Sequence, residues 1–165
     1  MKKQIFIVNG MGGCGKDTFA NFLSEFHKVF KYSSIDRVKQ IANECGWAGT
    51  KTEKDRKFLS DLKCLLTEYN DLPFTDVGNR VTDFLFYEDA TVMLIDIREP
   101  REIDKVKNAY GAKTILIKND RVPFISSNMA DAGVYNYDYD YTIENNGTLE
   151  EFRETVRVFA EQIGK

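Results

Sequence analysis

A glycine-rich stretch near the start of the chain carries the residues best suited to bind phosphate. Gly10, four further residues, Gly15 and Lys16 follow a short apolar run and precede residues with helical spacing, which is the context that a P-loop requires. The glycines let the backbone turn tightly and direct its N–H groups at phosphate oxygens, and the start of the helix adds its positive dipole end. The alternative, a glycine-rich turn before an ordinary helix, explains this combination less well. We therefore expect ATP to bind at Gly10, Gly12, Gly13, Cys14, Gly15, Lys16, Asp17 and Thr18.

An acid, Asp17, follows Lys16 where a P-loop normally has Ser or Thr. A bare triphosphate would repel this carboxylate, whereas Mg²⁺ would attract it, because Mg²⁺ prefers oxygen ligands and keeps several waters. The carboxylate would also interact favourably with the helix dipole in the first turn. Two roles therefore stay open, in the water shell of the metal or at the helix start. Thr18 can supply the missing hydroxyl.

A second acid, Asp96, ends the apolar run VMLID. A strand-end acid beside a P-loop typically handles the metal of the bound nucleotide, as the Walker-B residue does. The alternative is an acid that only caps the next helix. We favour the first interpretation, because this strand should neighbour the first strand and end beside the loop. The predicted metal ligands are Asp17, Thr18 and Asp96.

Isolated basic residues occur near the same predicted edge of the sheet. A kinase with a phosphorylated acceptor needs cations that hold the acceptor phosphate and cations that neutralise the phosphoryl group in transfer. Lys39, Arg56, Arg98 and Arg121 are the candidates, although each taken singly could be an ordinary solvated charge. Arg98 differs because it is fixed two residues after Asp96. We expect Lys16, Asp96, Arg98 and Arg121 to be catalytic.

Buried strands and amphipathic helices alternate along the chain. Residues 4–9, 31–35, 91–97, 113–117 and 139–144 have strand patterns. Helical spacing follows the glycine loop, recurs within 36–89 and at 101–110, and begins again at Thr148, where Glu151 completes a capping box. Alternation of this kind implies parallel pairing with right-handed crossovers.

The expected fold is therefore a single α/β domain over 1–165, a three-layer α/β/α P-loop fold with a parallel sheet of about five strands. Residues 36–89 would form a helical acceptor-binding insertion, and 119–138 a short lid. Ligands of such sheets bind at the carboxyl ends of the strands. The loops after Asn9, Ile35, Ile97, Ile117 and Glu144 should therefore meet at one edge.

The composition is that of an ordinary globular protein and excludes several function classes. The chain has 165 residues, 42% of them hydrophobic, and a net charge of −3, so nothing favours binding to nucleic acid or a membrane surface. Cys14, Cys45 and Cys64 show no paired spacing and no secretory signal is recognisable, so we expect free thiols and a cytoplasmic location. A monomer and a homodimer are both compatible with these features.

Four stretches of the chain resemble a known family. GKDTFANF, YSSIDRVKQIA, LIDIREPREIDKVKNAYGAKTILI and YDYTIENNGTLEEF follow the order seen in the bacteriophage-type deoxynucleoside monophosphate kinases, which belong to the adenylate-kinase-like P-loop kinases. The specific part is the loop Gly15-Lys16-Asp17-Thr18 with the later D-x-R-x-x-x-E, matched here by Asp96, Arg98 and Glu102.

The resemblance implies several roles. A loop acid after Gly-Lys is tolerated in this group. Lys39, Arg56 and Arg98 match basic positions around the acceptor, 119–138 matches the lid, and the turn Asn145-Asn146-Gly147 would lie near the adenine, which adds Asn146 to the expected ATP-binding residues.

The predicted function is ATP-dependent, Mg²⁺-assisted phosphoryl transfer to a nucleoside monophosphate, with a deoxynucleoside monophosphate as the expected acceptor. The partners would be ATP and this small phosphorylated acceptor, with no nucleic acid and no membrane. Two alternatives stay open, because a fold does not specify an acceptor. One is a kinase of another small acceptor, of the dephospho-coenzyme A or phosphomevalonate type. The other is a nucleotide-binding protein without transferase activity.

Overall fold

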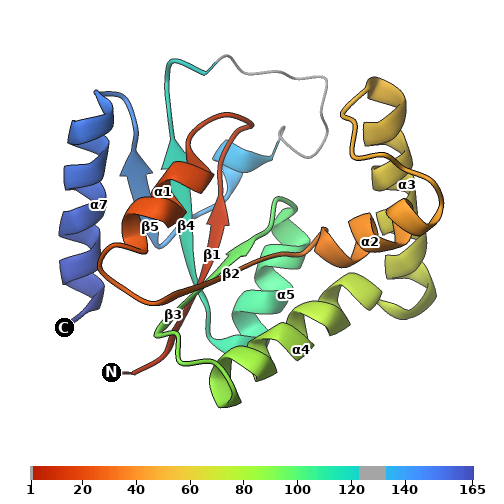
Figure 1. The fold of residues 1–165 in the computed structure, drawn as a ribbon, viewed down its shortest axis with the longest axis horizontal. Coiled ribbons are helices and arrows are strands. Elements are labelled where there is room, and N and C mark those ends of the chain that lie inside the picture. Colours follow the sequence, from red (N-terminus) through yellow and green to blue (C-terminus); the bar gives the residue numbers. More distant parts are fainter. Residues whose placement is uncertain (1, 123–132) are drawn as a thin grey trace.

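A computed structural model describes residues 2–122 and 133–165 of the chain. Its centre is a parallel sheet of five strands in the order β2-β3-β1-β4-β5 (Figure 1). The strands are β1 (Gln4–Asn9), β2 (Val29–Ser33), β3 (Val92–Asp96), β4 (Lys113–Lys118) and β5 (Tyr141–Glu144). The predicted parallel sheet is confirmed, and β3 does pair with β1.

Helices cover both faces of the sheet, which gives the three predicted layers. They are α1 (Lys16–Leu23), α2 (Asp36–Glu44), α3 (Glu53–Asn70), α4 (Leu72–Phe86), α5 (Pro100–Tyr110) and α7 (Leu149–Ile163), with a short 3-10 helix η1 (Val134–Asn136). On one face, Phe19 of α1 and Phe152 of α7 pack with Phe6, Val8 and Leu94 of the sheet. The opposite face carries α4 and α5.

The insertion between β2 and β3 consists of α2, α3 and α4. Helix α4 rests on the sheet through Val77, Val81 and Phe84, which are fully buried with the core. Helix α3, in contrast, contains no buried residue, and Figure 1 shows it standing away from the sheet, beyond α2. The insertion is therefore anchored by α4, while α2 and α3 border the edge where the strands end.

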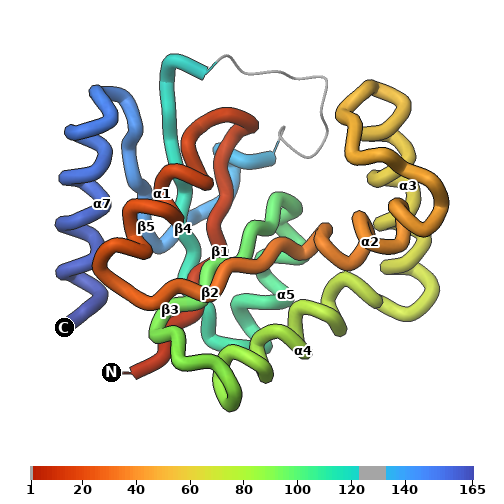
Figure 2. The backbone as a smooth tube through the Cα atoms, in the orientation of Figure 1, coloured from red at the N-terminus to blue at the C-terminus, as the bar shows by residue number. Residues whose placement is uncertain are grey.

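Both chain ends lie at the opposite edge of the sheet, as the backbone trace shows (Figure 2). The side-chain amide of Gln4, at the start of β1, donates to the carbonyl of Ile163 at the end of α7, over 2.6 Å. The loops that follow the strands are thus gathered at one edge, away from the termini.

Three local predictions can be compared with the structure. The capping box at the start of α7 is confirmed, because the Thr148 side chain accepts from the Glu151 N–H and the Glu151 side chain accepts from the Thr148 N–H. Strand β2 lies two residues earlier than expected, because the Asp36 carboxylate accepts the Ser33 N–H and begins the turn there. Strand β5 starts later than expected, because Asp140 exchanges hydrogen bonds with Thr114 through its side chain.

Candidate functional site

The glycine loop joins the end of β1 to the start of α1, as predicted. Gly10 has φ 151°, and a Cβ there would lie 2.5 Å from the Ile117 carbonyl oxygen, so a side chain would push the loop away from β4. Gly15 has φ 105°, and a Cβ there would lie 2.6 Å from the Asn145 side-chain nitrogen. Only glycine suits these two positions, which lets the loop fold tightly against the ends of β4 and β5.

Lys16 folds back over this loop. Its Nζ donates to the Gly10 carbonyl over 2.7 Å and to the Met11 carbonyl over 3.0 Å. These acceptors are uncharged, so phosphate oxygens would make stronger, charge-assisted bonds with the same ammonium group. The neighbouring Cys14 is buried, and burial raises the pKa of its thiol, which makes a lining role more suitable for it than a nucleophilic one.

Asn9, the last residue of β1, connects the loop to the rest of the edge. It is 1% exposed. Its Oδ1 accepts the Gly10 N–H over 2.8 Å, and its Nδ2 donates to the Arg98 carbonyl over 3.2 Å and to the Tyr139 hydroxyl over 2.9 Å. One buried amide thus fixes the start of the phosphate loop relative to Arg98, two residues after the strand-end acid.

Asp17 and Asp96 are brought together by a lysine that the sequence analysis did not single out. Lys31 of β2 donates to Asp17 Oδ1, and its Nζ also lies 3.7 Å from Asp96 Oδ2. Asp17 does lie in the first turn of α1, and its predicted interaction with the helix dipole is compatible with this position. The side chain of Asp17 is 88% exposed and that of Asp96 is 25% exposed.

The pKa values in this cluster shift in the directions that its charges dictate. The hydrogen bond from Lys31 lowers the pKa of Asp17. Burial raises the pKa of Asp96, although the charges of Lys31 and Lys16 oppose it. Burial by itself would lower the pKa of Lys31, but the two carboxylates outweigh it and the pKa is raised. At neutral pH, Lys31 is therefore firmly protonated.

The carboxylates of Asp17 and Asp96 suit a metal ion whose other ligands are water molecules and the phosphates of a bound nucleotide. Among the described residues, no group of three or more His, Cys, Asp or Glu could hold a metal. Mg²⁺ is usually bound through one or two carboxylates, together with waters and substrate phosphates. The two acids fit that pattern, and Thr18 follows Asp17 in the first turn of α1.

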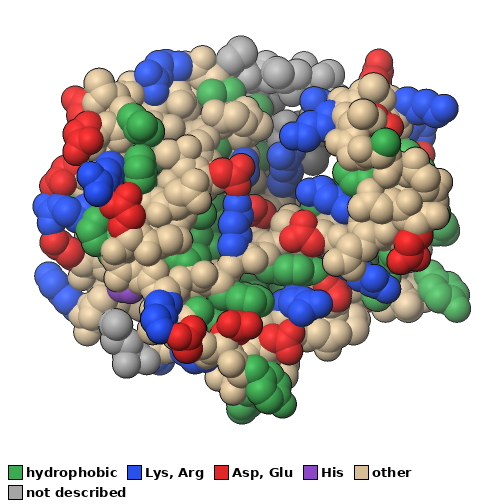
Figure 3. All heavy atoms as spheres, viewed as in Figure 1, with side chains coloured by type: hydrophobic (Ala, Val, Ile, Leu, Met, Phe, Trp, Pro, Cys, Tyr) green, Lys and Arg blue, Asp and Glu red, His purple; other side chains and the backbone are tan. Residues whose placement is uncertain are grey.

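The predicted acceptor cations lie on two different parts of the molecule. Arg98 follows β3 and is tied to the loop edge through the bond from Asn9 to its carbonyl. Lys39 lies on α2, where its Nζ is 3.8 Å from Asp36 Oδ1, and Arg56 is exposed in the first turn of α3. Figure 3 shows the surface hollowed between the α1 side and the α2–α3 side, with Lys and Arg side chains around the hollow.

Arg121 lies on the loop after β4 and contacts the loop after β5. Its guanidinium donates to the Asn145 carbonyl over 3.2 Å. Asn146 exchanges hydrogen bonds with Asp120, through its Oδ1 and the Asp120 N–H and through its Nδ2 and the Asp120 carboxylate, both over 2.8 Å. Arg121 is thus grouped with the predicted adenine-side turn. Of the predicted lid, 119–138, the stretch 123–132 lies outside the described residues.

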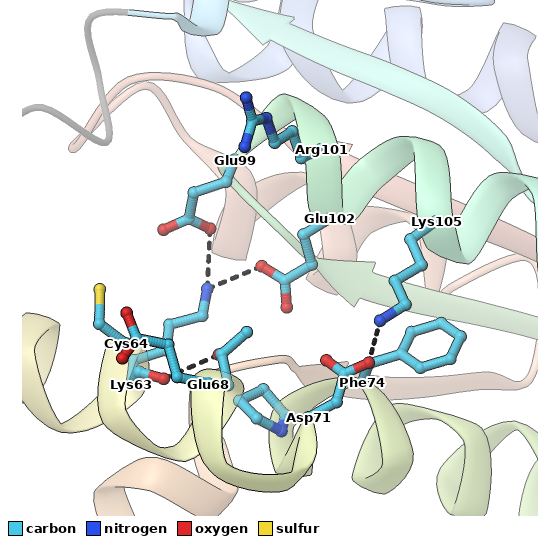
Figure 4. A pocket seen from close by; sticks show the side chains of 11 residues that line it. Lys63, Cys64, Glu68, Asp71, Phe74, Glu99, Arg101, Glu102 and Lys105 are labelled. Carbon is cyan, nitrogen blue, oxygen red and sulfur yellow. Dashed lines mark hydrogen bonds and ion pairs between the residues drawn. The ribbon is translucent and has the colours of Figure 1, made fainter.

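A cavity of about 390 Å³ begins one residue after Arg98. Helix α3 and the start of α4 form one wall and the start of α5 forms the other, as Figure 4 shows. Lys63 reaches across from α3, and its Nζ lies 2.7 Å from both Glu99 Oε2 and Glu102 Oε2. Phe74 supplies an aromatic surface with Lys105 over its ring.

Glu102 is the least solvated carboxyl of this cavity. Its side chain is 13% exposed, and its Oε1 is buried without a hydrogen-bond partner. Burial raises the pKa of Glu102, and the neighbouring Glu99 adds to this, while Lys63 acts in the opposite direction. A buried polar atom without a partner is costly, so this oxygen would gain from a hydrogen-bond donor that could approach it.

Two residues that matter here, Asn9 and Lys31, escaped the sequence analysis. Asn145 was expected only in a turn near the adenine, and its contact with the phosphate loop was not predicted. Lys31 had a recognisable signal, because a charged residue inside an otherwise apolar strand points to one definite face, and Asp96 at the end of β3 faces the same way. Asn9 and Asn145 had none, because their roles depend on buried contacts. The Asn145 side chain donates to the Cys14 carbonyl over 3.0 Å and so supports the loop from the β5 side.

Comparisons with known proteins support the fold. No protein-family model matches the chain, and a search of curated protein sequences gives no match. Among solved structures, a dephospho-CoA kinase from Campylobacter jejuni is similar, with a TM-score of 0.56, 17% identity and coverage of 98% of this chain and 97% of that one. A thymidylate kinase from Candida albicans has a TM-score of 0.54 and 11% identity, covering 99% and 93%. A shikimate kinase from Aquifex aeolicus has a TM-score of 0.50 and 13% identity, covering 98% of each chain.

These likenesses confirm the predicted fold class, an α/β P-loop kinase fold with a five-stranded parallel sheet. They show the fold alone and do not distinguish between the families that share it, since the similar structures have different substrates in their names. Within the described residues, none of the helices has the length and apolar character needed to cross a membrane.

Proposed function

We propose that this protein transfers a phosphoryl group from ATP to a nucleoside monophosphate, with deoxynucleoside monophosphates as the preferred acceptors. The observation that carries the proposal is the convergence of three groups at one sheet edge. The phosphate loop and Arg98, two residues after the strand-end acid, are joined by the buried side chain of Asn9, and a cavity large enough for a small molecule begins at the next residue, Glu99.

The donor would bind at the loop. Backbone N–H groups from Gly10 to Gly15 and the start of α1 would hold its phosphates. Lys16 would exchange its bonds to two loop carbonyls for bonds to the β- and γ-phosphates. The Asn145–Asn146 turn lies beyond the loop, toward β5, and is the proposed neighbour of the adenine. Mg²⁺ bound with ATP would shield charge on the β- and γ-phosphates, and Asp17, Thr18 and Asp96 are its proposed partners.

The acceptor would bind between Arg98 and the cavity. An arginine two residues after Asp96 can span the donor and acceptor phosphates, so that it holds the acceptor in line and neutralises the group in transfer. The base would then enter the cavity beside Phe74, where the unpartnered Oε1 of Glu102 can accept an N–H from its edge. Lys39 and Arg56 are the proposed contacts to the acceptor phosphate, and Arg121 is a proposed further cation for catalysis.

The chemistry would be direct in-line transfer. The described residues around the loop favour positioning and charge stabilisation over covalent catalysis, because the only thiol there, Cys14, is buried with a raised pKa. Acceleration would come from holding two phosphates in line and from fixed cations around the transferring group.

The deciding experiment is a coupled assay that measures ADP formed from ATP with a panel of acceptors. The panel contains ribo- and deoxyribonucleoside monophosphates, dephospho-coenzyme A and phosphomevalonate. Turnover of a nucleoside monophosphate supports the proposal. Turnover of another acceptor alone would retain a kinase with a different substrate, and ATP binding without any turnover would indicate a nucleotide-binding protein. The variant Lys16→Ala serves as the inactive control.

A variant of the cavity tests the placement of the acceptor base. Glu102→Gln keeps the size of the side chain but replaces one oxygen by an NH₂ group that cannot accept a hydrogen bond. We expect selectivity among the bases to change about tenfold, the equivalent of one hydrogen bond, with ATP affinity unchanged. The exposed Glu68→Gln on the rim of the same cavity is the matched control. If Glu102→Gln and Glu68→Gln have the same selectivity among the bases, Glu102 does not take part in base recognition.

A further inference from the structure

Lys31 occupies the space between the two acids that the proposed function assigns to the metal. Its Nζ forms an ion pair with Asp17 and lies 3.7 Å from Asp96 Oδ2. An ammonium group in this position satisfies the two carboxylates that a divalent cation would use. It therefore competes with that cation for the same charge.

The fold, rather than chance, puts this lysine there. In the parallel pairing of β2 with β3, Lys31 lies opposite Leu94 and Ser33 lies opposite Asp96. Residues two apart in a strand share a face, so Lys31 and Asp96 point to the same side of the sheet. That side is covered by α1, whose core residue Phe19 belongs to the same hydrophobic cluster as Leu94, and Asp17 is in the first turn of α1.

The interaction is also more than a surface ion pair of the usual kind. The side chain of Lys31 is 36% exposed and that of Asp96 only 25%, so solvent screens the contact to Asp96 less than it screens an exposed pair, whereas Asp17 is 88% exposed and its contact is screened more. Lys28, three residues earlier, gives a comparison, because its side chain is 68% exposed and pairs with Asp89, which is 80% exposed.

We propose that Lys31 is an internal counter-ion of the phosphate site, which sets the Mg²⁺ concentration at which the nucleotide binds. Without nucleotide, the ammonium group offsets one unit of the negative charge of Asp17 and Asp96 and keeps an acid tolerable beside an anion-binding loop. When Mg²⁺ and nucleotide enter together, the carboxylates exchange the ammonium for the divalent cation. The inference rests on the proposed binding of Mg²⁺ and ATP at this loop and goes beyond it by assigning a residue that tunes the metal requirement.

The first test uses Lys31→Met, which keeps the length of the side chain and removes its charge. Mn²⁺ binding to the nucleotide-free protein is measured by electron paramagnetic resonance. Because a unit charge within about 4 Å of the carboxylates is removed, we expect the Mn²⁺ dissociation constant to fall about tenfold or more. Lys28→Met, with the same change of net charge, is expected to leave that constant unchanged. An unchanged or higher constant in Lys31→Met, or equal shifts in both variants, would overturn the inference.

The second test follows nucleotide binding. With a fluorescent ADP analogue, the Mg²⁺ concentration at half-maximal binding should fall by a similar factor in Lys31→Met and stay unchanged in Lys28→Met. Adding Asp17→Asn to Lys31→Met should cancel most of the gain, because one of the two carboxylates is then neutral. A gain that persists in the double variant would contradict the role given to Asp17.

Thermal melting and circular dichroism first establish that each variant is folded, and Lys31→Gln replaces Lys31→Met if the latter is not. The two proposals can fail separately. If the wild type binds no nucleotide at any Mg²⁺ concentration, the proposed function fails, whereas the Mn²⁺ comparison still tests Lys31. If nucleotide binds but neither metal measurement responds to Lys31, only the counter-ion role is wrong.

Discussion

Replacing Asn9 by Ala removes the side chain that joins the phosphate loop to Arg98, two residues after Asp96. In the wild type this amide accepts the Gly10 N–H and donates to the Arg98 carbonyl and to the Tyr139 hydroxyl. Tyr139 keeps its own hydrogen bond to the Val134 carbonyl. The substitution therefore removes the side-chain acceptor of the Gly10 N–H and the side-chain donor to the Arg98 carbonyl.

The magnitude follows from these two groups. Gly10 is buried and Arg98 is half-buried, and an unsatisfied buried polar group costs about 1–3 kcal/mol. With the exposed part of Arg98 taken into account, the expected loss is about 2–4 kcal/mol of the free energy of unfolding. For a domain of this size that loss lowers Tm by about 5–15 °C. We also expect weaker ATP binding, because the first N–H of the loop loses its fixed orientation.

Differential scanning calorimetry and ATP titration by isothermal calorimetry measure the two effects. Asn9→Asp separates the contacts, because a carboxylate can still accept the Gly10 N–H but cannot donate to the Arg98 carbonyl. Asn108→Ala, an exposed change on α5, is the matched control and should shift Tm by no more than about 2 °C. If Asn9→Ala melts within that same margin of the wild type, the amide does not hold this edge together and the reasoning is refuted.

Three further predictions concern the charges of the site. Lys16→Ala should abolish most Mg²⁺-dependent ATP binding, because it removes the charge-assisted contact to the β- and γ-phosphates; unchanged affinity by calorimetry would exclude the loop as the ATP site. Arg98→Ala should lower kcat/KM for the best acceptor about 10²-fold or more while ATP binding survives; normal kcat and acceptor KM would make Arg98 a structural charge. Because Lys31 lowers the pKa of Asp17, the ionised carboxylate contributes stability above pH 3.8, the ordinary pKa of Asp, and loses it as the pH falls through the lowered value. The difference in Tm between wild type and Asp17→Asn should therefore shrink on acidification from pH 7 to pH 3, and a constant difference would mean that the ion pair does not contribute.

The phosphate loop could be identified from the sequence because its parts are contiguous. The strand, the glycines, Lys16 and the helix follow one another within 20 residues of the chain, so no long-range contact is needed to recognise the motif. The order of strands and helices likewise predicted a parallel three-layer fold, since alternation and hydrophobic period are local properties. The strand ends were less predictable. Asp36 and Asp140 compete for backbone groups through their side chains and so move the ends of β2 and β5.

Other parts of the candidate site depend on residues that are distant in sequence. Asn9 meets Arg98 because β1 lies beside β3, with Val8 opposite Asp96, and it also meets the hydroxyl of Tyr139, which is 130 positions away in the sequence. The cavity exists because α3 stands apart from α5 and Lys63 bridges them. Sequence periodicity predicts which face of a helix is buried, but it does not predict the distance between two helices.

Asp17 shows most clearly which features follow from the sequence and which follow from the tertiary structure. The sequence by itself determined that an acid follows Lys16 at the start of a helix, and elementary electrostatics required a positive partner for it beside a phosphate site. Which partner is available was decided by the tertiary structure, through the parallel register that turns Lys31 and Asp96 toward the same face and the packing of α1 over that face. The charge of a residue is a property of the sequence, but the charges that surround it depend on strand order and register. Here they bring Lys31 together with Asp17, 14 positions before it, and with Asp96, 65 positions after it.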